Sequence, residues 1–207
     1  SSKEMLDFRG PKIAMVFQDP TTTLNPVLRI ETQILMALRA HEKLSKAAAH
    51  AKAVEALERV GIPSPKERLR AYPHQLSGGQ RQRIMIAMAL ANKPDILIAD
   101  EPTTALDVTI QAQILDLLAE LKASEGMGLL FITHDLNIVR RIADKVCVMK
   151  DGEIVEAGPT SEIFDNPQHA YTQMLLAAEP TGRPDPVPEN AQELIRTDNL
   201  KVWFPVQ

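Results

Sequence analysis

One stretch, LSGGQRQRIMIAMALANKPDILIADEPTTALD at residues 76–107, constrains the fold of this chain more than any other. It begins with a glycine-rich turn (76–80) that opens directly into a helical pattern, and its apolar run (96–99) ends in Asp100 and Glu101. Glycine-rich turns that open helices present backbone N–H groups and a positive helix end to phosphate. A buried strand that ends in paired carboxylates suits a metal ligand beside a base that aligns water. The stretch therefore predicts phosphate chemistry.

Three short motifs in this stretch resemble the second half of an ABC-type ATPase. LSGGQ (76–80) is similar to the signature of that family, ILIADEP (96–102) to its Walker B strand, and Ala105-Leu106-Asp107 to its D-loop. Three motifs in the family's order are more specific than any one of them alone. The resemblance implies an α/β fold of the P-loop NTPase class, with a mostly parallel sheet and a helical subdomain.

The same resemblance implies which residues bind ATP and Mg²⁺. In the family, two such domains enclose two nucleotides head to tail, and the signature turn of one domain binds the γ-phosphate held by the other. The ATP-binding residues would be Gln18, Ser77, Gly78, Gly79, Gln80 and Asp107, with Asp107 bridging the two halves. Asp100 would hold Mg²⁺ through water, and Gln18, in the position of the Q-loop, would touch the metal and the attacking water.

By the same resemblance, Glu101 and His134 are the catalytic residues. Glu101 would polarise the attacking water, and His134 would act as the switch that senses the γ-phosphate. His134 directly follows an apolar run (129–133), just as Glu101 comes at the end of another. Strands that lead through a polar residue into a helix are typical of an open parallel sheet, whose ligands gather at the carboxyl ends of the strands.

Hydrophobic periodicity predicts the elements before the signature. Residues 12–17 form a continuous apolar run from Ile13 on, which predicts a buried strand of a parallel sheet. Apolar positions at helical spacing predict helices over 28–41 and 45–60. Ser45 is a suitable N-cap for the second helix, and Gly61 a suitable stop.

A β-hairpin is predicted after the last parallel strand. KVCVMK and EIVEAG, within 145–158, are joined by Asp151 and Gly152, which form a strong turn signal. Cys147 is the single cysteine, so no internal disulfide or multi-cysteine metal site is possible within the chain. Because Cys147 lies in an apolar run, we expect it to be a buried small side chain.

The segment QHAYTQMLL (168–176) resembles the His-Pro-Tyr-Thr tail of the oligopeptide and dipeptide importer subfamily. Ala170 stands where that tail usually has proline, and an ordinary C-terminal helix is the alternative.

Farther on, PTGRPDPVPEN suits an extended linker, and residues 194–204 alternate like a strand. This end resembles the opening of another ABC unit, as in a tandem ATPase; the alternative is an exposed tail. We therefore expect a partial nucleotide-binding domain (1–179, with a helical subdomain at 27–93 and a helical tail at 160–179), a linker (180–192) and the start of a second ABC unit (193–207).

The phosphate loop G-x-x-x-x-G-K-[ST] does not occur in the sequence, although nine glycines are present. In the family this loop precedes the Q-loop. We therefore expect the N-terminal, phosphate-loop part of the domain to be absent, so that the chain starts in mid-domain. The alternative is a naturally degenerate subunit that does not bind ATP.

Net charge and the length of the apolar runs limit the classes of partner that we expect. A formal net charge of −4 gives no reason to expect nucleic acid, because binding a phosphate backbone calls for a basic surface. No apolar run approaches the ~20 residues that span a bilayer. The resemblance implies a peripheral protein on the cytoplasmic face of the inner membrane, with a second ABC ATPase half and permease subunits as partners and, indirectly, a periplasmic or extracellular substrate-binding protein.

The function predicted from the sequence is that of an ATP-binding and ATP-hydrolysing subunit of an ABC importer for peptides or related small solutes. One alternative is a soluble ABC ATPase of DNA repair or translation. Such proteins usually carry zinc-binding cysteines, long coiled coils or basic insertions, and none occurs here. The other is a regulatory half that binds nucleotide without turnover, against which Glu101 and His134 argue.

Overall fold

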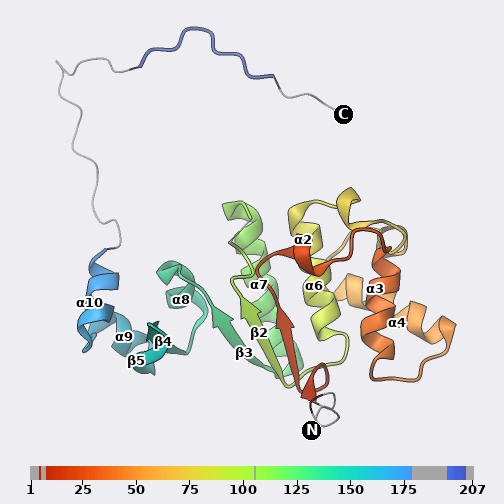
Figure 1. Cartoon of the computed structure of the whole chain (residues 1–207), viewed down its shortest axis with the longest axis horizontal. Coiled ribbons are helices and arrows are strands. Elements are labelled where there is room, and N and C mark those ends of the chain that lie inside the picture. Colours follow the sequence, from red (N-terminus) through yellow and green to blue (C-terminus); the bar gives the residue numbers. More distant parts are fainter. Residues whose placement is uncertain (1–4, 6–7, 105, 179–194, 204–207) are drawn as a thin grey trace.

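A three-stranded parallel sheet positions the predicted site residues (Figure 1). The computed structural model describes residue 5 and residues 8–104, 106–178 and 195–203. The strands are β1 (Ile13–Val16), β2 (Ile96–Asp100) and β3 (Gly128–Ile132), in the order β1-β2-β3. Ile13 pairs with Ile96, and Ile96 pairs with Gly128, so the three strands start level. Their carboxyl ends consequently share one edge of the sheet.

Helices fill the long connection between β1 and β2. They are α2 (Pro20–Thr23), α3 (Ile30–Arg39), α4 (Lys46–Arg59), α5 (Pro65–Arg68), a 3₁₀ turn at Pro73–Gln75, and α6 (Gly78–Leu90). The two helices predicted before the signature are confirmed with shorter ends. Ser45 caps α4 as predicted, since its side chain accepts a hydrogen bond from the Ala48 N–H at 3.2 Å, and Gly61 follows the helix at φ +69°.

The helices after β2 and β3 begin at aspartates. Asp107 precedes α7 (Val108–Glu125), and its carboxylate accepts the Ile110 N–H at 3.0 Å. Asp135 precedes α8 (Leu136–Ile142) and accepts the Asn137 N–H at 2.9 Å. An N-cap of this kind contributes about 1 kcal/mol of helix stability. Each cap also fixes where the chain turns away from the sheet, close to the strand's carboxyl end.

The hairpin predicted near 145–158 is confirmed. Strands β4 (Lys145–Lys150) and β5 (Glu153–Pro159) pair antiparallel, and Asp151 and Gly152 turn between them at φ +51° and +85°. Two positive φ angles are what a two-residue hairpin turn requires. Two helices follow, α9 (Thr160–Asp165) and α10 (Ala170–Ala177).

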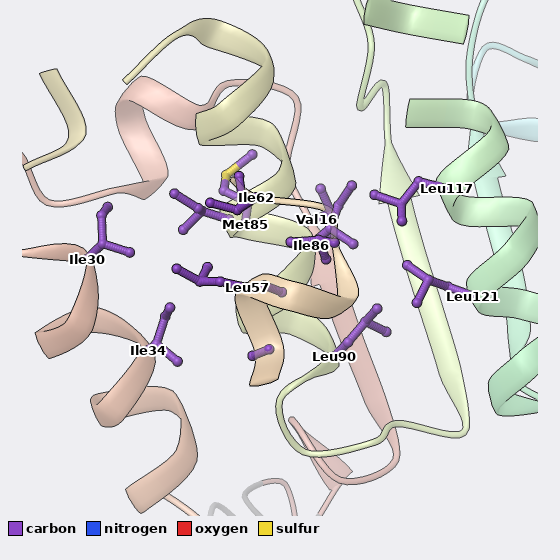
Figure 2. Packing of buried hydrophobic residues seen from close by; sticks show 14 of the residues in the cluster. Val16, Ile30, Ile34, Leu57, Ile62, Met85, Ile86, Leu90, Leu117 and Leu121 are labelled. Carbon is purple, nitrogen blue, oxygen red and sulfur yellow. The ribbon is translucent and has the colours of Figure 1, made fainter. Parts of the chain in front are cut away.

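The core joins the helical layer to one face of the sheet. Figure 2 shows Ile30 and Ile34 of α3 and Leu57 of α4 facing α6, whose Ile86 lies beside Val16 of β1. On the other side of Val16, α7 contributes Leu117 and Leu121. Most of these side chains are completely buried, and each such side chain stabilises the fold by about 1.5–3 kcal/mol.

Among the described residues, only one face of the sheet is buried, which corrects the expectation that 12–17 form a buried strand. Along β1, Ala14 and Val16 are buried, whereas Ile13 and Met15 are 39% and 38% exposed. Ile132 in β3 is 44% exposed. An unbroken apolar run predicts burial on both faces. The described helices cover the face that carries Val16, so alternate side chains remain in solvent.

Cys147 is exposed, so the prediction of a buried thiol was wrong. Its neighbours Val146 and Val148 are half-buried, while Met149 and Ile154 are 59% and 61% exposed. One face of the hairpin is therefore partly buried, and the other face is exposed to solvent. An apolar run therefore did not imply burial at every position.

The chain after the hairpin and its helices gives a further correction. Much of the segment 194–204, predicted to be strand-like, lies within the described range 195–203, and no strand forms there. Trp203 is 86% exposed and Ile195 85% exposed, because no partner strand pairs with this segment. The predicted linker 180–192 lies outside the described residues. Within the described part of the chain, no helix is long and apolar enough to cross a membrane.

Candidate functional site

Glu101 occupies a strained backbone position at the carboxyl end of β2. Its φ is +43°, in the left-handed region that residues other than glycine rarely adopt. The position is held because its N–H donates to the Ile132 carbonyl of β3 at 2.9 Å. Strain of this kind costs of the order of 1–3 kcal/mol and concentrates at functional sites.

Three donors converge on the Glu101 carboxylate. The Gln18 amide, beyond the end of β1, donates to Oε2 at 2.8 Å, and the Thr104 hydroxyl donates to the same oxygen at 3.0 Å. His134, beyond the end of β3, places Nδ1 3.0 Å from Oε1. Because a carboxylate only accepts hydrogen bonds, His134 carries its proton on Nδ1 in this contact. Residues that follow all three strands therefore meet at one carboxylate.

The pair formed by Glu101 and His134 shifts the titration of both groups. Hydrogen bonds from His134 and, second, from Thr104 lower the pKa of the Glu101 carboxyl. The hydrogen bond to Glu101 raises the pKa of His134. The His134 side chain is 72% exposed and that of Glu101 25%, so the pair borders solvent. A low pKa keeps Glu101 ionised at neutral pH, the form able to accept a proton or orient water.

Asp100 and Gln18 carry the oxygens that were predicted to hold Mg²⁺. Asp100 is the last residue of β2, next to Glu101, and the Gln18 amide nitrogen donates to Glu101. Among the described residues, no three His, Cys, Asp or Glu side chains are grouped so as to hold a metal. Mg²⁺ is commonly bound by one or two protein oxygens together with water and substrate phosphates. The donor set therefore fits Mg²⁺ that arrives with a nucleotide.

The signature turn closes on itself at the start of α6. Ser77 Oγ accepts the Gln80 N–H at 3.3 Å, and Gln80 Oε1 accepts the Ser77 N–H at 3.2 Å. This reciprocal capping box fixes the turn. Gly78 and Gly79 are the first residues of a thirteen-residue helix, where N–H groups have no acceptor one turn earlier. Their position suits an anion.

The signature turn packs against the start of α7. A methyl group built on Gly79 would lie 2.6 Å from Cγ2 of Ile110, whereas one on Gly78 would lie 3.6 Å from Leu106, an ordinary contact. Gly79 is thus required for the close approach of α6 and α7. Both glycines were predicted to serve phosphate binding alone, so the packing role of Gly79 was missed.

Seven of the nine predicted site residues form two groups, while Asp100 ends β2 and Asp107 caps α7. Gln18, Glu101 and His134 are joined by hydrogen bonds, and the turn of Ser77–Gln80 lies beside the segment that leads into α7. Within the described residues, no hydrogen bond joins the two groups. Thr104 was not predicted, although its place three residues after Glu101, in a tight turn, is a signal for such a contact.

The comparison with known families agrees with this geometry. Residues 1–104 match the family model described as "ABC transporter". The chain belongs to the ABC transporter family. Its fold class is likewise shown by the ATP-binding cassette MJ0796, solved as a dimer bound to ADP and Pi: this cassette is 33% identical, has a TM-score of 0.67, and is matched over 77% of this chain and 68% of its own.

Curated relatives of this ABC transporter chain are ATP-binding proteins. The peptidoglycan transport ATP-binding protein YejF of Agrobacterium fabrum is 57% identical over 96% of this chain and 36% of its own length. The oligopeptide transport ATP-binding protein OppD of Bacillus subtilis is 56% identical over 87% of this chain and 51% of its own. The chain thus spans about a third to a half of these relatives.

A second match covers the C-terminal part of this ABC transporter chain. Residues 155–199 match the model described as "Oligopeptide/dipeptide transporter, C-terminal region", which agrees with the predicted resemblance of 168–176. Glu156 of β5 accepts the backbone N–H groups of Gln168 and His169 at 2.7 and 3.1 Å, and His169 Nδ1 accepts the Tyr171 N–H. Ala170 is the first residue of α10, a position where proline and alanine both fit.

Proposed function

We propose that this sequence belongs to an ATP-hydrolysing subunit that drives an importer of peptides or related small solutes. The observation that carries the proposal is the convergence of Gln18 and His134 on the Glu101 carboxylate. The match of 155–199 to the oligopeptide and dipeptide transporter region supports the choice of solute. Because the chain spans only part of its relatives, the activity is assigned to the complete encoded protein.

In this proposal, Glu101 polarises the water that attacks the γ-phosphate. The carboxylate is ionised and oriented by donors before nucleotide arrives, as a base of this kind requires. His134 contributes its ring in the protonated form, which the raised pKa favours: Nδ1 donates to Glu101, and the Nε2–H would donate to the γ-phosphate. Phosphoryl transfer gains mainly from such positioning and from stabilisation of charge.

Mg²⁺ is the cofactor that fits beside this carboxylate. Asp100 and the amide oxygen of Gln18 would be the protein groups that hold it. When bound, the ion neutralises charge that develops on the phosphate oxygens. Gln18 then links metal binding to Glu101, because its amide nitrogen donates to that carboxylate.

The signature turn acts on a nucleotide held by a second ABC half. Ser77, Gly78, Gly79 and Gln80 contact the γ-phosphate, and Asp107 lies next to the same interface. The contact of Gly79 with Ile110 supports this pairing, because it makes the signature turn and the start of α7 one surface. The second half is either fused or a separate chain.

The remaining partners are those of an importer. Closure of two ATPase halves is transmitted to permease subunits through the segment after Gln18 and through α3–α6, and a substrate-binding protein delivers the solute outside. The protein works at the cytoplasmic face of the inner membrane. The proposal includes no nucleic-acid partner.

Transport by the complete protein tests the proposal. The protein would be reconstituted with permease subunits of an oligopeptide importer, and uptake of a labelled oligopeptide into vesicles would be measured with ATP, without ATP, and with Glu101→Gln. ATP-dependent uptake that the variant abolishes is expected. Steady ATP turnover without any associated permease would favour a soluble ABC ATPase, and nucleotide binding without turnover would favour a regulatory half.

A further inference from the structure

Thr104 is the one donor to the Glu101 carboxylate that has no part in binding ATP or Mg²⁺ in the proposed function. Its hydroxyl donates to Glu101 Oε2 at 3.0 Å, and its backbone N–H donates to the Glu101 carbonyl at 3.3 Å. A tight turn therefore brings the hydroxyl back over the residue three positions earlier. The contact depends only on local chain geometry.

Each of the other two donors has a second task in the proposed function. Gln18 shares Oε2 with Thr104, and His134 holds Oε1. In the proposed function, the other polar atom of Gln18 faces a cation and that of His134 a γ-phosphate, so nucleotide binding and release pull on both donors. Thr104 contacts the carboxylate and no ligand, so its hydroxyl stays on Glu101 when nucleotide leaves.

The turn that carries Thr104 also reaches the signature surface. The Leu106 N–H donates to the Thr103 carbonyl at 3.1 Å, and Leu106 is the side chain nearest to Gly78. Thr104 thus lies between the left-handed residue Glu101 and the segment that faces the signature turn. A displacement of that segment moves the hydroxyl and, with it, the carboxylate.

We propose that Thr104 is a positioning residue whose hydroxyl keeps the Glu101 carboxylate aimed at the attacking water through the catalytic cycle. This inference rests on the proposed function, and it adds a residue that acts through Glu101. Thr104 is exposed, so its replacement leaves the core intact. Its side chain fills no buried space, which separates the hydrogen bond from packing.

The test compares Thr104→Val, which keeps the shape but removes the donor, with Thr104→Ser, which keeps the donor. Both are made in the complete encoded protein, and kcat and KM for Mg-ATP are measured. We expect Thr104→Val to lower kcat about tenfold, the effect of losing one hydrogen bond to a charged group. KM should stay within about twofold, and Thr104→Ser should recover most of kcat.

Two controls separate positioning from a structural role. Thr160→Val removes a hydroxyl that donates to the Ala143 carbonyl at 2.6 Å, away from Glu101, and should leave kcat unchanged. In a Glu101→Gln background, Thr104→Val should cause no further loss, because residues that act as one unit are not additive. A structural defect would lower kcat again in that background.

The outcomes are distinguishable. An active wild-type protein whose kcat is unchanged by Thr104→Val would overturn the role of Thr104 alone. The same holds if Thr104→Ser is as slow as Thr104→Val, or if the losses from Thr104 and Glu101 simply add. A wild-type protein without ATP turnover would overturn the proposed function together with this role.

Discussion

The two groups of the candidate site are held in place in different ways. The carboxylate of Glu101 is bound by side chains that follow three different strands, at 2.8–3.0 Å. The signature turn is closed by reciprocal hydrogen bonds between Ser77 and Gln80, and it presents the start of a helix. The group around Glu101 forms only when all three strands end at the same edge of the sheet. The signature turn requires only five consecutive residues and a closely packed neighbour.

This difference determines which substitutions disrupt each group. The hydrogen-bond network around Glu101 is lost when one charged partner is removed, while the fold persists. The backbone surface of the signature turn is disrupted when a side chain is added, and the effect depends on whether that side chain meets a ligand or a neighbouring helix. Gly78 and Gly79, adjacent in the chain, differ in this respect.

The largest expected effect is that of Glu101→Gln in the complete encoded protein. The amide keeps the size of the side chain but cannot act as a base, so turnover should fall by about 10²–10⁴-fold while ATP binding persists. Phosphate release and nucleotide affinity are measured together. Glu120→Gln, the same change at an exposed position of α7, is the matched control and should have no effect. Unchanged turnover in Glu101→Gln would show that Glu101 is not the base.

Gly78→Asp should give the next largest effect. A built methyl group there meets only an ordinary contact at 3.6 Å, so the fold should tolerate a side chain. The new carboxylate repels a γ-phosphate held by a second half, and roughly 3 kcal/mol of repulsion near a surface corresponds to about a hundredfold weaker ATP-driven association.

Association in the Gly78→Asp protein is measured by sedimentation with Mg-ATP, with Gly78→Ala as the uncharged control. Gly78→Ala should associate nearly normally. If Gly78→Asp also associates normally, no phosphate approaches this turn.

Local structure could be predicted from the sequence because its causes are local. Ser45, Asp107 and Asp135 mark helix starts by a chemistry that acts over three residues. The turn at Asp151 and Gly152 is equally local. The convergence on Glu101 followed from a more general rule, that parallel strands end at one edge, combined with a family resemblance.

Burial could not be predicted in the same way. Met15 and Ile132 belong to runs as apolar as any in the chain, yet each is exposed. Periodicity reports that a side chain is apolar, and burial depends on which elements pack over it. For the same reason the approach of Gly79 to Ile110 was missed: it joins two helices whose relative placement no local pattern encodes.

Gly79→Ala should have a smaller effect, on stability and not on charge. Its methyl group would lie 2.6 Å from Ile110, and overpacking of this kind costs about 1–3 kcal/mol, partly offset by about 1 kcal/mol of helix propensity. Urea unfolding should show the Gly79→Ala protein less stable than wild type and Gly78→Ala not destabilised. Adding Ile110→Ala to Gly79→Ala should cost less than Ile110→Ala alone costs in wild type. Additive losses would show that the two residues are not in contact.

The smallest effect is a pH dependence within the first group. The pKa of Glu101 is lowered chiefly by the hydrogen bond from His134, so its contribution to stability is present above the ordinary glutamate pKa of about 4.3 and is lost as pH falls through the lowered value. The pKa of His134 is raised by Glu101, so its contribution is present below the ordinary histidine pKa of about 6.5 and is lost as pH rises through the raised value. The pair is therefore strongest between these two ordinary values.

An NMR titration of the His134 ring, without metal or nucleotide, measures the coupling directly. The pKa of His134 should exceed that of an exposed histidine, and Glu101→Gln should return it toward the ordinary value because the attracting charge is gone. Thr104→Val should leave it raised, since Thr104 contacts the carboxylate and not the ring. If Glu101→Gln does not change the pKa of His134, the carboxylate and the ring are not paired in solution, and the first group loses its link between the ends of β2 and β3.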